Sequence, residues 1–160
     1  WHYPDTKEID EKYSVTKNGM TGKEYVGDIA EGWNYGWTGY SWNERLFPDY
    51  KKFLQELAER NLKITLNLHP ADGVRFWETQ YDKMAQAVGV DSASKHYIPF
   101  RLDDEKYINA YFSVLLKPFE ADGVEFWWID WQQGEKSDKE GLDPLWALNH
   151  YHYYPQYHIV

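Results

Sequence analysis

Hydrophobic residues follow two different periods in the middle of the chain. From Tyr50 to Ala58 they recur at the spacing of an amphipathic helix, which predicts a helix over about 48 to 60 with Pro48 in its first turn. From 62 to 69 apolar and polar residues alternate strictly, which predicts a strand with one apolar face. Pro70 lacks a backbone N–H and is expected to end this strand.

Residues that leave the helical conformation easily mark the expected helix ends. Asn61 provides a cap for the first helix. A second helix is expected over about 74 to 88, ending at Gly89. A third is expected over about 104 to 120, stopping before Gly123.

The last part of the chain predicts one more strand and one more helix. Residues 124 to 131 form a short and nearly continuous apolar run, which is typical of a strand buried on both faces. A helix is expected over about 142 to 153, with Pro144 near its start. Pro118 is expected to kink or fray the last turn of the preceding helix.

The order of these elements indicates a parallel α/β protein. Residues 4 to 36 are polar and rich in glycine, and we expect them to form a long irregular loop. Helix, strand, helices, strand and helix then follow, as in a barrel or a doubly wound sheet. No glycine-rich phosphate loop follows either strand, which disfavours the nucleotide-binding sheet. We therefore expect residues 1–160 to be one segment of a (β/α)8 TIM barrel containing about half of its strands.

Composition narrows the range of partners. The chain carries a formal charge of −9 and no basic cluster, which argues against nucleic acid and anionic membranes. It has no cysteine, so disulfides and thiolate sites are excluded. The cellular compartment is not determined by the sequence, although the absence of cysteine favours the cytoplasm. Aromatic residues make up 19% of the chain. Flat rings with polar tips suit the apolar faces and hydroxyl groups of sugars.

The candidate chemistry lies at the ends of the two expected strands. His69 and Asp130 both occupy such a position, where the catalytic residues of β/α barrels are found. Alternation puts Phe126, Trp128 and Asp130 on one face, with the indole beside the carboxylate. Cleavage of a glycoside with retention needs an ionised carboxylate and a protonated carboxyl group about 5 Å apart. A strand-end Asp that caps a loop or helix is the structural alternative.

Several stretches resemble glycoside hydrolase family 31, the α-glucosidase and α-xylosidase family. The run Phe-Trp-Trp-Ile-Asp-Trp-Gln-Gln-Gly (126–134) is similar to the strand that carries the nucleophile in that family. The others, in the same order, are Trp-Thr-Gly-Tyr-Ser-Trp-Asn (37–43), Leu-Phe-Pro-Asp (46–49), Leu-Asn-Leu-His-Pro (66–70) and Gly-Leu-Asp-Pro-Leu-Trp (141–146). The resemblance spans about 37 to 150.

The resemblance implies a retaining α-glycoside hydrolase that works through a covalent glycosyl-enzyme intermediate without a metal or cofactor. Its nucleophile falls on Asp130, and its substrate would be an oligosaccharide or glycoside, with glucose as the family default. Substrate-binding roles fall on residues beside the expected strand ends, with Trp1 following the family's preceding strand. They are Trp128, Trp131, His69, Asn67 and Trp1. Many relatives have an Asp where His69 stands.

Two departures from the family pattern limit the implied function. The residues after Asp130 are Trp131, Gln132 and Gln133, where the family usually has Met-Asn-Glu. The family's acid/base Asp lies downstream of the nucleophile, and no matching motif occurs before Val160. We therefore expect a segment that is inactive by itself, with exposed barrel edges and apolar faces that favour oligomers.

The sequence is also compatible with other functions. The aromatic content also fits a non-catalytic carbohydrate-binding protein, although such modules are usually all-β. A transglycosylase of the same family would have the same motifs. A metal site at His150, His152 and His158 is disfavoured, because helix positions i and i+2 point to different faces. Carboxyl groups elsewhere could supply the acid/base if the chain is complete: Glu31, Asp72, Asp103, Asp104 and Glu135.

Overall fold

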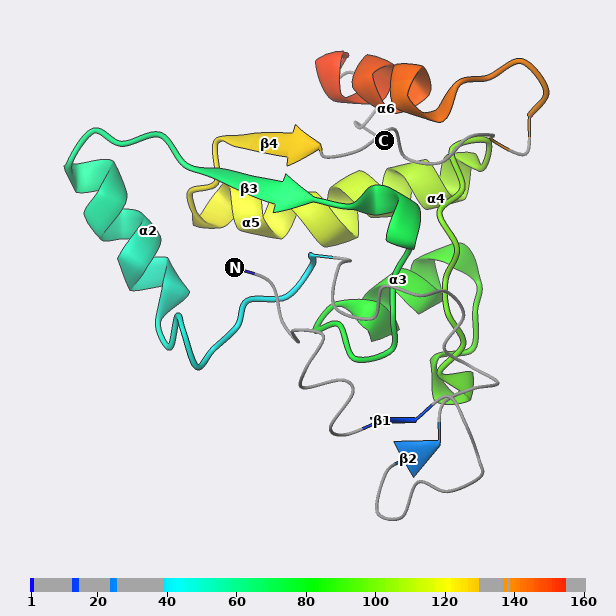
Figure 1. Ribbon diagram of the computed structural model, residues 1–160, viewed down its shortest axis with the longest axis horizontal. Coiled ribbons are helices and arrows are strands. Elements are labelled where there is room, and N and C mark those ends of the chain that lie inside the picture. Colours follow the sequence, from blue (N-terminus) through cyan, green and yellow to red (C-terminus); the bar gives the residue numbers. More distant parts are fainter. Residues whose placement is uncertain (2–12, 15–23, 26–38, 130–136, 138, 155–160) are drawn as a thin grey trace.

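The computed structural model is a mixed α/β structure (Figure 1). It describes residues 1, 13–14, 24–25, 39–129, 137 and 139–154. Two pairs of parallel strands occur in the described residues, namely β1 (Tyr13–Ser14) with β2 (Glu24–Tyr25), and β3 (Thr65–Leu68) with β4 (Phe126–Ile129). The parallel pairing of β3 and β4 confirms the α/β class that the order of elements predicts.

Helix α2 (Tyr50–Glu59) confirms the first predicted helix, but it begins two residues later than expected. Asp49 is its N-cap, and the Asp49 carboxylate accepts a hydrogen bond of 3.0 Å from the Lys52 backbone N–H. Pro48 therefore lies before the helix and not in its first turn. An acidic N-cap satisfies one of the N–H groups that a helix start leaves open, which is why the boundary falls at Asp49.

The end of α2 has the cap that Asn61 predicts. Asn61 is left-handed, with φ of +58°, and its N–H donates to the Ala58 carbonyl over 2.9 Å. The Leu62 N–H donates to the Leu57 carbonyl over 3.1 Å. This pair of bonds is a Schellman motif, and it turns the chain directly towards β3.

Strand β3 is shorter than the alternating run that predicts it. Leu66 and Leu68 are buried as expected, whereas Leu62 is exposed and lies before the strand. Pro70 ends the strand as predicted and starts a short 3-10 turn, η1 (Pro70–Asp72).

Helix α3 (Tyr81–Val88) is much shorter than the helix predicted over 74 to 88. Val74 forms an antiparallel bridge with Ile98 instead, through hydrogen bonds of 2.9 and 3.0 Å in both directions. Its backbone groups are therefore committed to a distant segment and cannot start a helix. Gly89 ends the helix in the left-handed conformation, as predicted.

The helix predicted over 104 to 120 forms as three consecutive segments. They are α4 (Glu105–Ala110), a π-helical segment η3 (Tyr111–Leu116) and α5 (Lys117–Asp122). The Lys117 N–H donates to the Phe112 carbonyl, five residues back, directly before Pro118. A proline ring clashes with the carbonyl four residues earlier, and the wider π turn relieves this clash. Pro118 therefore acts on the middle of the helix and does not fray its last turn.

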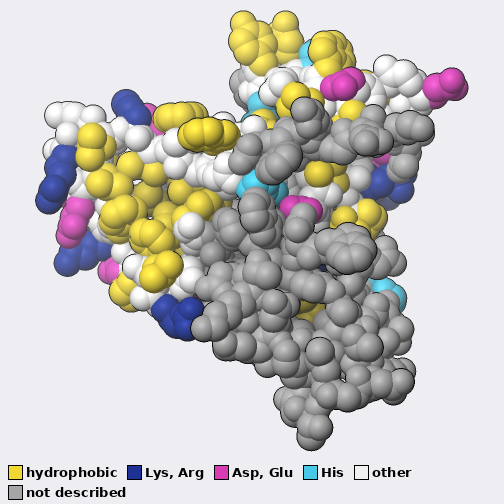
Figure 2. Space-filling model, in the orientation of Figure 1, with side chains coloured by type: hydrophobic (Ala, Val, Ile, Leu, Met, Phe, Trp, Pro, Cys, Tyr) yellow, Lys and Arg dark blue, Asp and Glu magenta, His cyan; other side chains and the backbone are white. Residues whose placement is uncertain are grey.

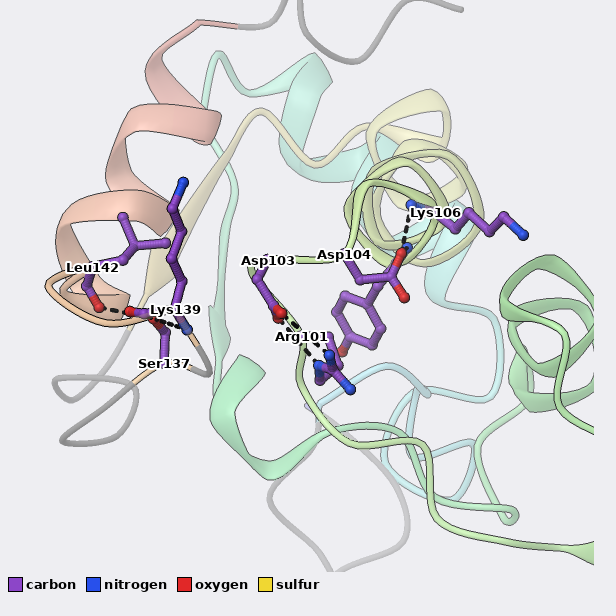
Figure 3. Close-up of polar contacts among 8 residues, drawn as sticks. Arg101, Asp103, Asp104, Lys106, Ser137, Lys139 and Leu142 are labelled. Carbon is purple, nitrogen blue, oxygen red and sulfur yellow. Dashed lines mark hydrogen bonds and ion pairs between the residues drawn. The ribbon is translucent and has the colours of Figure 1, made fainter.

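Side-chain hydrogen bonds cap α4 and hold the loop before α6 together (Figure 3). The Asp104 carboxylate accepts from the backbone N–H groups of Lys106 and Tyr107, at 2.9 and 3.3 Å. Ser137 Oγ lies 2.9 Å from the carbonyl oxygens of both Lys139 and Leu142. The Asp104 contacts fix where α4 begins, and the Ser137 contacts close the turn that leads to α6.

Helix α6 (Pro144–Tyr153) confirms the last predicted helix. The Asp143 carboxylate caps it by accepting from the Trp146 backbone N–H over 2.8 Å. Ala147 and Leu148 face the core, where they pack with residues of α4 and the π-helical segment.

Two hydrophobic clusters make up the core. The larger one joins Leu68 of β3 to α3, α4, the π-helical segment and α6. The smaller one joins Leu66 of β3 to Leu54 of α2 and Phe119 of α5. Trp1 and Trp127 pack against both clusters and link them. Among the described residues, no helix has the length and apolar character needed to cross a membrane.

Candidate functional site

The carboxyl ends of β3 and β4 lie side by side. Their register pairs Asn67 with Trp128 and Leu68 with Ile129, and both arrows point the same way in Figure 1. His69 continues from β3 at this edge. The predicted nucleophile Asp130 and the predicted sugar contact Trp131 follow β4 in sequence, but both lie outside the described residues.

The two faces of this strand pair differ sharply in burial. Leu66 and Leu68 are buried against the helices. Phe126 and Trp128 point to the other side, where their side chains are 52% and 62% exposed. The prediction of a strand buried on both faces is therefore wrong for β4. Helices in the described residues cover only one face of the pair.

Asn67 shares the exposed face with Trp128. Directly paired residues of parallel strands project to the same side, so the Asn67 amide and the Trp128 indole belong to one surface. The Asn67 side chain is half-buried. This surface combines a large flat ring with a group that both donates and accepts hydrogen bonds.

Trp1 lies close to Asn67 but inside the protein. The Trp1 indole N–H donates to the Asn67 backbone carbonyl over 3.0 Å. The Trp1 ring packs edge-on against Trp42 and Phe119, with ring centroids 5.1 and 5.6 Å apart. Its carbonyl accepts from the Asn43 backbone N–H over 2.8 Å. These contacts account for Trp1 as a packing residue, and its role in substrate binding stays a prediction.

His69 is buried at the point where β3 ends. Its side chain is 6% exposed, and its carbonyl accepts from the Asp72 N–H over 3.1 Å at the start of the 3-10 turn. The His69 side chain therefore belongs to the protein interior next to the end of β3, whereas the Trp128 side chain is exposed. Contact of His69 with a substrate stays a prediction.

A buried polar cluster, which the sequence analysis does not predict, lies beside the loop that follows β3. Glu78 is 4% exposed, and Ser41 Oγ donates to its carboxyl oxygen Oε2. Ser41 Oγ also accepts from the Thr79 backbone N–H over 2.9 Å. Arg75 is buried as well, with its guanidinium carbon 4.0 Å from the centre of the Tyr97 ring.

Burial controls the protonation of this cluster. Loss of water raises the pKa of Glu78 to about 8, although the Ser41 and Tyr40 hydrogen bonds and the Arg75 charge act in the opposite direction. The carboxyl group is thus mostly protonated at neutral pH, as a general acid must be. Glu78 is nevertheless buried and hydrogen-bonded to Ser41, so its role is structural: it holds the 40–43 segment against the 75–79 loop.

This cluster was missed because Glu78 fell inside a helix predicted over 74 to 88. On a surface helix over 74 to 88, Glu78 would be an ordinary exposed carboxylate. The Val74–Ile98 bridge turns the chain inward instead and buries both Arg75 and Glu78. The only local signal was Ser41 within the aromatic 37–43 motif.

The other candidate acid/base groups have structural partners where they are described. Asp104 caps α4, and Asp103 pairs with Arg101 through bonds of 3.1 and 3.2 Å (Figure 3). The Arg101 hydrogen bond lowers the pKa of Asp103, which favours the ionised form and not a proton donor. Asp72 lies in the 3-10 turn after β3. Glu31 and Glu135 lie outside the described residues.

The two described histidines of α6 contact different partners. His152 Nε2 lies 3.2 Å from the Tyr111 hydroxyl, whereas the His150 ring stacks on Trp146. This confirms that positions i and i+2 point to different faces. His158 lies outside the described residues.

No protein-family model and no curated protein matches this chain. The candidate site therefore stands on its residues and on the geometry of β3 and β4.

Proposed function

We propose that this chain is part of the catalytic (β/α)8 barrel of a retaining α-glycoside hydrolase, with Asp130 as its nucleophile. The observation that carries the proposal is the parallel pairing of β3 and β4, because it brings the carboxyl ends of both strands to one edge. Asp130 is the residue that follows β4 in the sequence. The motif resemblance over 126–134 supports the same residue.

The exposed face of the strand pair supports a sugar as substrate. Trp128 offers an open indole on the same face as the Asn67 amide. An indole stacks on the apolar face of a sugar ring, and an amide can bond a hydroxyl group as donor or acceptor. We propose that Asn67 and Trp128 line the sugar site, together with Trp131, His69 and Trp1.

The proposed reaction proceeds in two displacements. A carboxylate oxygen of Asp130 attacks the anomeric carbon, the bond to the glycosidic oxygen breaks, and a protonated carboxyl group gives its proton to that oxygen. Water then attacks the same carbon and gives a proton back to this group, and Asp130 leaves as a carboxylate. By resemblance, we propose that the acid/base lies outside residues 1–160 and that the segment alone is inactive.

Substitution of Asp130 tests the proposal in the intact protein of which these residues would be a part. Asp130→Asn should lower kcat on an aryl α-glucoside by at least about a thousandfold, because an amide cannot displace the leaving group. Asp82→Asn, which changes an exposed carboxylate on α3, is the matched control and should leave kcat unchanged. Near-native turnover by Asp130→Asn would sink the assignment.

Covalent trapping tests the role of Asp130 without its acid/base. Fluoride leaves without protonation, so 5-fluoro-α-glucosyl fluoride should form a glycosyl adduct on Asp130 that mass spectrometry of peptides can locate. Asp82→Asn should keep the adduct and Asp130→Asn should lose it. An adduct on another carboxyl group would contradict the proposal.

A non-catalytic carbohydrate-binding protein is the second candidate, and the exposed rings of Phe126 and Trp128 favour it. The mixed α/β fold differs from the all-β sandwich of most binding modules. Glycan binding without turnover and without an adduct in the intact protein would select this candidate.

A further inference from the structure

A row of aromatic side chains runs along the outer side of α6. Trp146, His150 and Tyr154 follow each other at intervals of four residues, and Tyr153 lies beside the last of them. Trp146 is 62% exposed, Tyr153 76% and Tyr154 39%. Figure 2 shows hydrophobic side chains gathered over this helix at the top of the molecule.

The rings of this row support each other. Trp146 and His150 are stacked, with centroids 5.4 Å apart and planes at 15°. The His150 and Tyr154 rings follow at 4.8 Å, and Tyr153 meets Tyr154 edge-on, also at 4.8 Å. Side chains that are already ordered lose less conformational entropy when a ligand binds. Because Ala147 and Leu148 supply the buried contacts of α6, the row is not needed to cover the core.

The row is also free of formal charge. Residues Pro144–Tyr153 include no Asp, Glu, Lys or Arg, although charged residues make up 27% of the chain and its net charge is −9. An anionic ligand would find no counter-charge on this helix, and the carboxylate of its N-cap, Asp143, already accepts a hydrogen bond from the Trp146 backbone N–H. The surface is therefore complementary to a neutral ligand.

The size of the row fits a short ligand better than a protein partner. The exposed parts of Trp146, Tyr153 and Tyr154 amount to roughly 270–440 Å² if a whole aromatic side chain offers about 150–250 Å². A stable protein interface takes about 800 Å² from each partner, so this row alone does not support a dimer. At the helical rise of about 1.5 Å per residue, Trp146 and Tyr153 lie about 10 Å apart along the axis, the length of a short oligosaccharide.

We propose that the Trp146, Tyr153 and Tyr154 row of α6 is a glycan-binding surface that takes a neutral oligosaccharide, in addition to the site at the strand ends. The apolar faces of successive sugar rings stack on the aromatic rings, and the hydroxyl group of Tyr153, the most exposed of them, bonds a sugar hydroxyl. The choice of a sugar as the ligand class rests on the proposed function. Such a surface holds a long substrate near the barrel and raises its local concentration.

The test follows the Trp146 indole N–H signal by NMR while the full chain is titrated with maltoheptaose. The signal is assigned as the one missing in Trp146→Ala. We expect a saturable shift, and Tyr153→Ala should raise the Kd read from this signal about fivefold or more, because one stacking ring is lost. Leu46→Ala is the matched control, since Leu46 is 70% exposed, close to the 76% of Tyr153, but lies before α2, and it should leave this Kd unchanged.

Three results would overturn the proposal. One is no shift of the Trp146 signal at millimolar maltoheptaose. Another is equal affinity for an anionic oligogalacturonate, which would exclude a site selective for neutral glycans. The third is a shift that follows protein concentration and a dimer, seen by sedimentation, that Trp146→Ala abolishes, because the occupant would then be a second copy. Loss of this site should leave the trapping of Asp130 intact, so the two proposals fail separately.

Discussion

Glu78 is a carboxyl group that the fold removes from water and ties to Ser41. In the unfolded chain its pKa lies near 4.5, and in the folded protein burial raises it to about 8. Between these two values the folded state binds more protons than the unfolded state. The free energy of unfolding therefore decreases as the pH rises through this range and levels off above the folded pKa.

Glu78→Gln should remove this pH dependence. The glutamine amide keeps a hydrogen-bond acceptor for Ser41 but carries no ionisable group. Deprotonation of Glu78 should lower the wild-type free energy of unfolding by on the order of 3 kcal/mol between pH 5 and pH 8. The variant should not show this decrease. Urea unfolding at several pH values measures the difference. Glu44→Gln, at an exposed position near Ser41, is the control and should keep the wild-type slope.

At the level of single elements, local caps explain most helix boundaries. Asp49, Asp104 and Asp143 each accept a hydrogen bond from a backbone N–H in the first turn of the helix that follows. Gly89 and Gly123 end α3 and α5 in the left-handed region. These signals act within a few residues, so they can be found without the tertiary structure.

Two neighbouring aspartates in the loop before α4 test the importance of a cap. Asp104→Ala should lower the free energy of unfolding by about 1 kcal/mol, because two backbone N–H groups lose their acceptor. Asp103→Ala removes only an exposed ion pair with Arg101 and should cost less than about 0.5 kcal/mol. Thermal and urea unfolding of both variants give the comparison. Equal costs would show that the cap contributes no more than the surface pair.

At the level of the whole molecule, the sheet has one covered and one open face. Leu66 and Leu68 pack into the two hydrophobic clusters, while Phe126 and Trp128 of β4 remain exposed. Figure 2 also shows hydrophobic side chains gathered at the left, over the region of α2 and the strands. Open apolar surface of this kind favours association.

Polar substitutions on the open face should reduce self-association of the chain. In Phe126→Thr/Trp128→Thr, threonine keeps the tendency to form a strand but removes two exposed rings. We expect a lower weight-average mass at high protein concentration, measured by sedimentation equilibrium. Leu46→Thr, at an exposed turn position before α2, is the control and should change the mass little. The same mass for the double variant and the wild type would rule out this face as the contact.

Some residues of the candidate site can be found from the sequence, and others cannot. Asp130, Asn67 and Trp128 were identified from motifs and alternation, and the parallel register of β3 and β4 makes Asn67 and Trp128 neighbours. Glu78 and Ser41 lie 37 positions apart, and a contact between such distant residues produces no periodic pattern in the sequence. A pattern along the chain can reveal strand ends, but it cannot show which distant polar groups will meet beneath them.

The sequence by itself determined the mixed α/β class, the cores of α2, α3, α6 and the 105–122 helix, and the stops at Asn61, Gly89 and Gly123. Each depends on periodicity or on hydrogen bonds within about five residues. Only the tertiary structure decided the late start of α3, the burial of Glu78 and the open face of β4. These depend on contacts such as Val74 with Ile98, because burial is set by which distant segments cover a residue.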